Sequence, residues 1–333
     1  MRAVGFFRSY SLYFKRGELT SLWATFGAFL YAVIIVVTPW DILQGAELVD
    51  RASYLNNLAV NLPVWEIYAD QGWIFIALQE FLWDFIIRSF SWLSGSDNAA
   101  LSMVTFFLSY VISRFVLIRS TSLITFILLL NPVLIELVSS QLRLALAFSL
   151  ILIFYNRGGY LFRVGVLLMV MLIHTASILI IAVLWYAQFI TRAFRGQSAA
   201  FFIVAIVVPV LIFAGLLGPG RELVLGAIGD RRAEYVVDAV GVGFTSVWIL
   251  YLTVALYHGK KSFESSSTVV AFFFVLLFLL LNAMGAYGLR FLTVAYPHFI
   301  VSTNYFNGYY KILFLLVFLN FQLLQWLYFI KIL

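Results

Sequence analysis

The chain has 333 residues, of which 64% are hydrophobic and 11% are charged, and its formal net charge is +6. A soluble domain carries about 45–50% apolar and about 25% charged residues, so this composition excludes a water-soluble fold. The lack of cysteine excludes disulfides and thiolate metal ligands. The three histidines show no H-x-x-x-H spacing, so we expect no metal and no cofactor. The positive charge indicates membrane topology and not nucleic-acid binding.

The first twenty residues carry four basic residues and one acidic residue: Arg2, Arg8, Lys15 and Arg16 against Glu18. Positively charged flanks stay on the cytoplasmic side of a membrane, so the N-terminus is predicted to be cytoplasmic and the apolar run 21–39 to cross outward. Residues 40–71 are acidic, with Arg51 as their one basic residue. They are expected to begin a first outer (periplasmic) loop that extends over residues 40–98.

The stretch 72–94 is apolar overall but carries charges at i, i+4 and i+8, which are Glu80, Asp84 and Arg88. This spacing places the three side chains on one face of a helix, where they can pair with one another. We interpret the stretch as an amphipathic helix that lies in the membrane interface with its charged face in water. The alternative is a membrane span whose charged face points into the helical bundle.

Two apolar runs follow at 99–118 and 121–138, and Pro132 is expected to kink the second. Residues 139–141 are predicted to turn at the outer face, so that Arg143 begins the next apolar helix there. That helix is expected to end at 156–159, where glycines and an arginine indicate a cytoplasmic turn.

The apolar run 161–190 is too long for one untilted span and too short for two, because a span needs about 20 residues. Arginines flank it on both sides. If both flanks are cytoplasmic, the segment must cross outward and return, with a broken helix near His174. Broken helices in membranes line cavities, so His174 is predicted to lie at the bottom of an outward-facing pocket. A single long tilted helix is the alternative.

The remaining chain alternates apolar runs with polar turns. Residues 199–217 are predicted to cross outward, and 218–242 to form a second large outer loop. Further membrane segments are expected at 242–257, at 268–284, around Pro297 and at 312–330. The predicted fold is all-α: a single transmembrane domain, 1–333, forming a polytopic integral membrane helical bundle with about ten to eleven membrane segments. No internal repeat indicates an inverted-repeat transporter.

This topology gathers one histidine and several arginines at the outer face: His174 with Arg143, Arg221, Arg231, Arg232 and Arg290. Ionisable residues in membrane segments are functional-site candidates, and the guanidinium fork fits phosphate. Three alternatives stay open. The loop arginines can pair with nearby acids, Arg143 and Arg290 can extend to lipid head groups, and His174 can hydrogen-bond between helices. No nucleotide-binding motif is present, so an activated donor such as a lipid-linked pyrophosphate sugar is indicated.

Three stretches form an ordered pattern: VDRASY followed by ADQGWIFIALQEF, SSQLRLALA followed by LIHTASILI, and YGLRFLTVAYP. In this order they resemble the EpsG/Wzy-type membrane polysaccharide polymerases. That family's Asp-x-x-x-Tyr and acidic-x-Gly-aromatic patterns are similar to Asp50, Tyr54, Asp70, Gly72 and Trp73. Its arginine-led helix, histidine turn and late arginine are similar to Arg143, His174 and Arg290. The chain departs from the pattern in having Leu144 after Arg143, Gln141 before it, and Thr175, Ala176 and Ser177 after the histidine.

The resemblance implies a metal-independent glycosyltransferase that polymerises undecaprenyl-pyrophosphate-linked oligosaccharide repeat units, as in O-antigen and exopolysaccharide biosynthesis, at the outer face of the bacterial inner membrane. We assign the donor pyrophosphate to Arg143 and Arg290. We assign the base to His174, whose type of side chain titrates near neutrality when unperturbed. An outer carboxylate is the rival base, and the candidates are Asp50, Glu222 and Asp230.

Substrate contacts are expected from a wider set of residues: Gln141, Asp50, Tyr54, Arg221, Glu222, Asp230, Arg231 and Arg232. Membrane lipid, the lipid-linked glycan, a chain-length regulator and a flippase are the candidate partners. The alternative functions are a lipid-linked glycan transporter or flippase, which needs the same basic cavity but makes no covalent product, and an outer-face glycan ligase.

Overall fold

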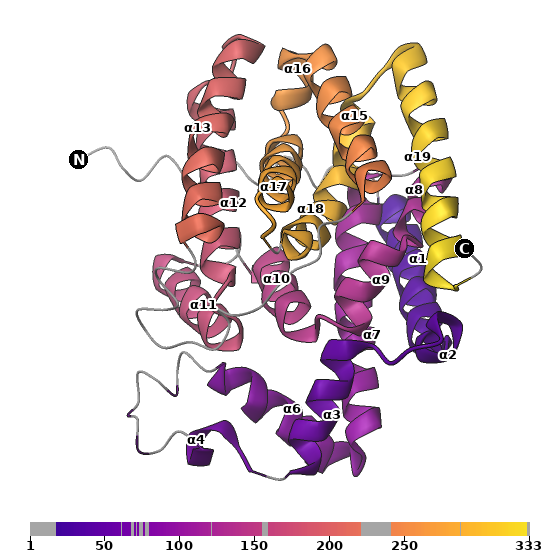
Figure 1. Ribbon diagram of the computed structural model, residues 1–333, viewed down its shortest axis with the longest axis vertical. Helices are drawn as coiled ribbons and strands as arrows, with labels where there is room; N and C mark the ends of the chain where they lie inside the picture. Colours follow the sequence, from indigo (N-terminus) through magenta and orange to yellow (C-terminus); the bar gives the residue numbers. More distant parts are fainter. Residues whose placement is uncertain are drawn as a thin grey trace. The chain divides into compact units, whose positions relative to one another are not determined.

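The computed structural model (Figure 1) describes residues 18–331 apart from 61, 68–69, 71, 73–75, 77–79, 121, 155–158, 221–240 and 287. The described residues form helices and no strand. Their bounds are α1 Glu18–Val37, α2 Trp40–Gln44, α3 Val49–Ala59, α4 Val64–Ile67, α6 Phe81–Ser94, α7 Asp97–Arg119, α8 Leu123–Leu129, α9 Pro132–Ser139, α10 Leu142–Phe154, α11 Tyr160–Ile173, α12 Ser177–Ala193, α13 Ala199–Leu217, α15 Val242–His258, α16 Lys260–Phe263, α17 Ser266–Ala283, α18 Leu289–Ser302, η5 Thr303–Tyr305 and α19 Gly308–Phe329.

Four of the described helices are long and apolar enough to cross a membrane: α7, α13, α17 and α19. The pair α9 and α10 is bent by 95° and adds a fifth if it counts as one broken span. Shorter apolar helical stretches lie at Ser21–Val37, Leu161–Ile173, Ser177–Ala193 and Val242–His258. By length and composition the chain is a multi-pass, all-helical membrane protein. The count of ten to eleven membrane segments stays a prediction.

The chain divides into two compact units. Unit 1 comprises Met1–Ile127 and Leu137–Ile178, and unit 2 comprises Leu128–Glu136 and Leu179–Leu333. The expected single domain stays a prediction, as does the first outer loop at 40–98. The second outer loop, 218–242, lies almost wholly outside the described residues.

Unit 1 is built on α7, against which α1, α3, α6 and α10 pack (Figure 1). The seam between α1 and α7 is close because Gly27 of α1 has no side chain. A Cβ at that position would lie 3.2 Å from Cδ1 of Leu117 on α7. α10 also packs against α11, and α11 against α6, so the helix that carries Arg143 in its first turn packs between α7 and α11 within this unit.

Unit 2 is built on α17, which packs against α13, α15, α16 and α18. Aromatic side chains fill its core. The ring of Phe299 on α18 lies 5.2 Å from that of Trp248 on α15 and 4.7 Å from that of Phe318 on α19, measured between ring centres. Such edge and tilted contacts add to the hydrophobic stabilisation of large buried rings.

The predicted interruption at Pro132 is confirmed, and it is a complete break between α8 and α9. Proline fits the first position of a helix because it has no N–H to leave unpaired. Asn131 caps α9, since its Oδ1 accepts a hydrogen bond from the backbone N–H of Val133 at 2.9 Å. The carbonyls exposed by the break are also satisfied. Tyr296 donates to that of Leu128 at 3.2 Å and Trp326 to that of Leu130 at 2.8 Å.

The turn predicted at 139–141 is confirmed as the 95° bend between α9 and α10, and Arg143 is the second residue of α10. α9 has 8 residues and α10 has 13, so neither alone reaches the roughly 20 residues of a span. The bend therefore places the first turn of α10, and its arginine, at an irregular point of the backbone. Irregular backbone at membrane depth occurs where it is buried in protein or lines a cavity.

The predicted break near His174 is also confirmed, because α11 ends at Ile173 and α12 begins at Ser177. The backbone of His174 is extended, with φ −157° and ψ 114°. Its N–H still donates to the carbonyl of Val170, and its own carbonyl accepts from Ser177. One continuous helix over 161–190 is therefore excluded.

The helix predicted from residue 72 to residue 94 is interrupted at Glu80, and most of its first half lies outside the described residues. α6 begins at Phe81, and Glu80 before it has a left-handed backbone with φ 62° and ψ 37°. The predicted pairing of Asp84 with Arg88 is confirmed at 3.0 Å. Glu80 does not continue their helical face, because its backbone leaves the helix there. With 14 residues α6 is shorter than a span, and its place in the membrane interface stays a prediction.

Candidate functional site

Arg143 and Glu80 form an ion pair between the first turn of α10 and the residue before α6. A cation at a helix N-terminus is unfavourable, because the macrodipole is positive there. The Glu80 carboxylate offsets this cost through its contact with Nη1 of Arg143. The arginine side chain keeps 34% of its surface exposed, whereas Glu80 keeps 9%. The charge pair is thus buried on its carboxylate side and accessible on its guanidinium side.

The same carboxylate also reaches His174 at the break between α11 and α12. Nδ1 of His174 lies 2.5 Å from Oε1 of Glu80, and both side chains keep 9% of their surface exposed. One carboxylate therefore joins two of the three residues that were predicted as catalytic from the sequence. Buried ion pairs are costly to build unless their hydrogen bonds are complete, and ionisable groups in such places are candidates for functional sites.

Tyr54 is the third residue in contact with Arg143. It lies on α3, and its hydroxyl accepts a hydrogen bond from Nε of Arg143 at 3.2 Å. The guanidinium carbon lies 5.3 Å from the centre of the Tyr54 ring, within the range of a cation–π contact. The ring in turn packs 5.0 Å from that of Trp83 on α6. Burial raises the pKa of the Tyr54 hydroxyl, and this outweighs the nearby guanidinium, which lowers it. The hydroxyl therefore stays neutral.

Two further predicted residues lie close to the cluster. Asp50 is in the first turn of α3, one turn before Tyr54, and its charge interacts favourably with Arg143. Gln141 is buried at the bend before α10, where its backbone carbonyl accepts from the N–H of Ala145 at 2.9 Å. We define the Arg143 cluster as Glu80, Arg143, His174 and Tyr54, with Asp50 beside it.

The other predicted site residues lie in unit 2 or outside the described residues. Arg290 belongs to unit 2, where it is the second residue of α18. Five predicted substrate contacts lie outside the described residues, namely Arg221, Glu222, Asp230, Arg231 and Arg232. The Arg143 cluster can therefore be argued from unit 1 alone, and the roles of the other residues stay predictions.

Glu80 is the functional residue that the sequence did not reveal as part of the site. Because Glu80, Asp84 and Arg88 are spaced four residues apart, the sequence predicted that all three lie on one charged face of a helix. Two signals pointed elsewhere: Glu80 is followed by a hydrophobic helix, and Arg143 had no acidic neighbour in the sequence. A carboxylate within an apolar stretch needs a cationic partner, and this one finds it 63 residues away.

The geometry leaves one edge of the Arg143 guanidinium accessible to an anion. Nε bonds Tyr54 and Nη1 bonds Glu80. Nη2 has no hydrogen bond to any residue that the structure describes, and a third of the side chain is exposed. A guanidinium edge held in this way fits a phosphate oxygen. In the same described part of the chain, no three His, Cys, Asp or Glu side chains are grouped so that they could hold a metal ion.

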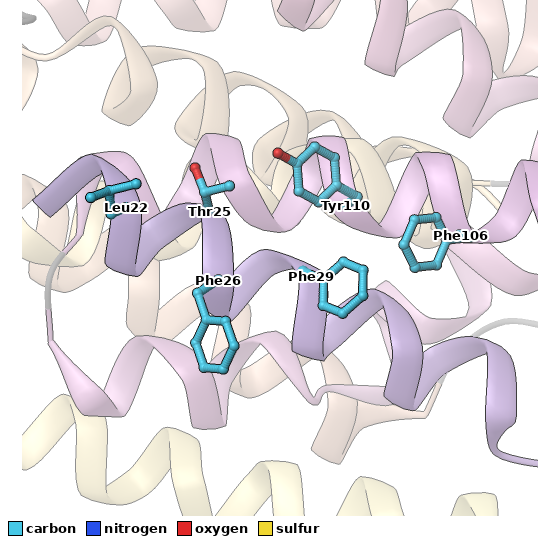
Figure 2. A pocket seen from close by; sticks show the side chains of 6 residues that line it. All are labelled: Leu22, Thr25, Phe26, Phe29, Phe106 and Tyr110. Atoms are coloured by element: carbon cyan, nitrogen blue, oxygen red, sulfur yellow. The ribbon is translucent and has the colours of Figure 1, made fainter. Parts of the chain in front are cut away.

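Figure 2 shows an open apolar groove of about 460 Å³ between α1 and α7. It is lined by Leu22, Thr25, Phe26, Phe29, Phe106 and Tyr110. At its edge Arg114 donates to the hydroxyl of Thr25 at 3.3 Å. None of the cluster residues lines this groove, and its apolar walls suit the hydrocarbon part of a membrane. The Arg143 cluster is therefore the candidate functional site of the chain.

Comparisons of the chain with protein-family models, with curated proteins and with solved structures found no match. The function must therefore be argued from the site itself.

Proposed function

We propose that this protein polymerises lipid-pyrophosphate-linked oligosaccharide repeat units at the outer face of the cytoplasmic membrane. The donor is a glycan on undecaprenyl pyrophosphate and the acceptor is a second lipid-linked repeat unit. Arg143 binds the donor pyrophosphate and His174 is the general base. The resemblance of the sequence to EpsG/Wzy-type polymerases is the source of this substrate class.

The observation that supports the proposal best is the meeting of Tyr54, Arg143 and His174 in one cluster. Tyr54 comes from the first of the stretches that together resemble the family, and Arg143 and His174 come from the two parts of the second. Tyr54 contacts Arg143 directly, and Arg143 and His174 share the carboxylate of Glu80. A cluster of an exposed guanidinium edge and a buried imidazole suits a transfer reaction that creates an anionic leaving group.

The proposed step is a substitution at the anomeric carbon of the donor sugar. The acceptor hydroxyl oxygen forms a bond to that carbon while the bond from the carbon to the pyrophosphate oxygen breaks. The hydroxyl proton passes to His174, and undecaprenyl pyrophosphate leaves with the bonding electron pair. Arg143 stabilises the negative charge that develops on the leaving group. The imidazolium then returns its proton to water, and the site is ready for the next turnover.

The test is incubation of the purified protein with synthetic undecaprenyl-pyrophosphate repeat units, followed by gel analysis of the glycan. A ladder of lengths is expected from the wild-type protein, and none from Arg143→Ala. Normal long-chain product from that variant would show that Arg143 is not needed to bind the donor pyrophosphate. If the wild-type protein gives no ladder with any competent repeat unit but moves labelled lipid-linked glycan across vesicle bilayers, the protein is a transporter and the proposal is wrong.

A further inference from the structure

We infer that Glu80 is the positioning residue of this site, an inference that rests on the polymerase function proposed above. Its carboxylate holds His174 in the tautomer whose Nε2 can accept the proton of the acceptor hydroxyl. The same carboxylate fixes the guanidinium of Arg143 beside it. Glu80 thus sets the base and the pyrophosphate receptor relative to each other, without touching the reacting atoms itself.

The tautomer follows from the hydrogen bonds. The neighbouring cation Arg143 favours the ionised form of Glu80. An ionised carboxylate only accepts hydrogen bonds, so Nδ1 of His174, at 2.5 Å from Oε1, must carry the hydrogen. Neutral imidazole has one N–H, and its lone pair then lies on Nε2. When Nε2 takes a proton, the carboxylate also stabilises the imidazolium that forms, as in other acid–histidine pairs.

The backbone of Glu80 supports a role for its side chain. Among the described residues, only Glu80 and Lys331 are non-glycine residues with positive φ, and Glu80 has φ 62°. The left-handed region is sterically costly for a residue with a Cβ, and glycine occupies it freely. Turn geometry alone is therefore better served by glycine. Strain of this kind collects at functional sites, and here it directs the carboxylate to both partners.

Charged and titratable groups reach the cluster from several described elements. Arg143 faces Glu80 from α10, and Tyr54 and Asp50 approach Arg143 from α3. His174 contributes the imidazole from the α11–α12 break. Arg143 is the cation in contact with the carboxylate, so removing Glu80 changes both the imidazole and the guanidinium.

The first measurement is nitrogen NMR of the full-length protein labelled with ¹⁵N-histidine, at a pH where the imidazole is neutral. The chain has three histidines, so the His174 signals are those lost in His174→Gln. We expect protonated Nδ1 in the wild-type protein. In Glu80→Gly the ratio of the Nδ1–H to the Nε2–H tautomer should fall by about tenfold, because a hydrogen bond to a charged group is lost. A wild-type Nε2–H tautomer, or an unchanged ratio in the variant, overturns the inference.

Glu80→Gly is the informative variant because glycine adopts the same backbone without strain, so the loss of the carboxylate is separated from misfolding. Glu80→Gln tests the charge, and Glu66→Gln on the exposed helix α4 is the matched control. With lipid-linked repeat units, kcat should fall at least about 100-fold in both Glu80 variants, the scale of general base catalysis. KM should change little, and the control should match the wild-type protein.

The two proposals fail in different ways. If the wild-type protein makes a ladder and Glu80→Gly has the same kcat, the positioning role is wrong and the polymerase function stands. If the wild-type protein makes no ladder, the polymerase function is wrong, and the tautomer ratio still decides whether Glu80 holds His174.

Discussion

Nε of Arg143 donates a hydrogen bond to the hydroxyl of Tyr54 at 3.2 Å, and the same tyrosine ring lies under the guanidinium at 5.3 Å. This contact joins α3 to the first turn of α10, which follows the bend. In the sequence, α3 lies between α1 and α7. The ring packs on Trp83 of α6, so the guanidinium is oriented by a side chain that is itself held in place. The arginine is thus preorganised, which is what electrostatic catalysis requires.

Tyr54→Phe keeps the ring and removes the acceptor for Nε of Arg143. A hydrogen bond to a charged group contributes about 1.5–3 kcal/mol, so the polymerisation rate should fall by about tenfold or more. The measurement is the initial rate of ladder formation from lipid-linked repeat units. Tyr110→Phe, in the groove between α1 and α7, is the control and should retain the wild-type rate. An unchanged rate in Tyr54→Phe would mean that the hydroxyl does not orient the arginine.

Arg143→Lys keeps the positive charge but loses the planar fork. A lysine ammonium cannot bond Tyr54 and Glu80 and still offer a second N–H edge to a pyrophosphate. Removing one preorganised donor to a developing anion typically lowers kcat about 100-fold or more, and this is the expected loss of polymerisation rate. Arg119→Lys is the matched control. Arg119 is exposed at the end of α7, where it bonds the carbonyl of Phe115. Equal rates for both variants would refute the role of the fork.

The sequence predicted Arg143 and His174 as site residues because a charged or titratable side chain inside an apolar run is costly and therefore conspicuous. It did not predict Glu80, because the partners of Glu80 are 63 and 94 residues away along the chain. Local spacing to Asp84 and Arg88 was the stronger signal at that point. Which carboxylate pairs with which cation is decided by tertiary packing, and periodicity does not contain that information.

In the fold too, local sequence predicts where helices lie, whereas tertiary packing decides how they bend and break. The helix predicted at 199–217 coincides with α13, because hydrophobicity and a serine cap mark its ends. The 95° bend between α9 and α10 could be placed at 139–141 but its angle could not be predicted. The break at Asn131 depends on hydrogen bonds from Tyr296 and Trp326, which lie 168 and 196 residues from the carbonyls they satisfy.

Arg88→Ala should destabilise unit 1. Arg88 bonds the Asp84 carboxylate at 3.0 Å and donates to the carbonyls of Asn57 and Leu62, so it holds α6 against the end of α3 and the chain that follows it. Its loss leaves the buried Asp84 without this partner, at an expected cost of about 2–4 kcal/mol. The midpoint of thermal unfolding in detergent should fall. Adding Asp84→Asn should recover part of the loss, since the buried negative charge that Arg88 balanced is then gone. No recovery would show that the carbonyl contacts alone matter.

Asn131→Ala tests the break between α8 and α9 in unit 2. The side chain caps α9 through Oδ1 and donates from Nδ2 to Oε1 of Gln325 at 2.7 Å. Losing both bonds should cost about 1–3 kcal/mol of unfolding free energy. Asn131→Ser restores a capping oxygen but not the bond to Gln325, so it should recover about 1 kcal/mol. Equal unfolding midpoints for the two variants would show that the cap contributes nothing.

The predicted outer-face location of the cluster can be tested by cysteine labelling, because the natural chain contains no cysteine and gives no background. Glu66 on α4 and Lys260 on α16 are both exposed. Positively charged loops stay cytoplasmic, so Glu66→Cys should react with a membrane-impermeant maleimide in intact spheroplasts. Lys260→Cys should react only after lysis. The reverse pattern would place the first loop, with Tyr54 and Glu80, on the cytoplasmic side. Lipid-linked repeat units would then have to be polymerised before export, and the proposal of polymerisation at the outer face would be wrong.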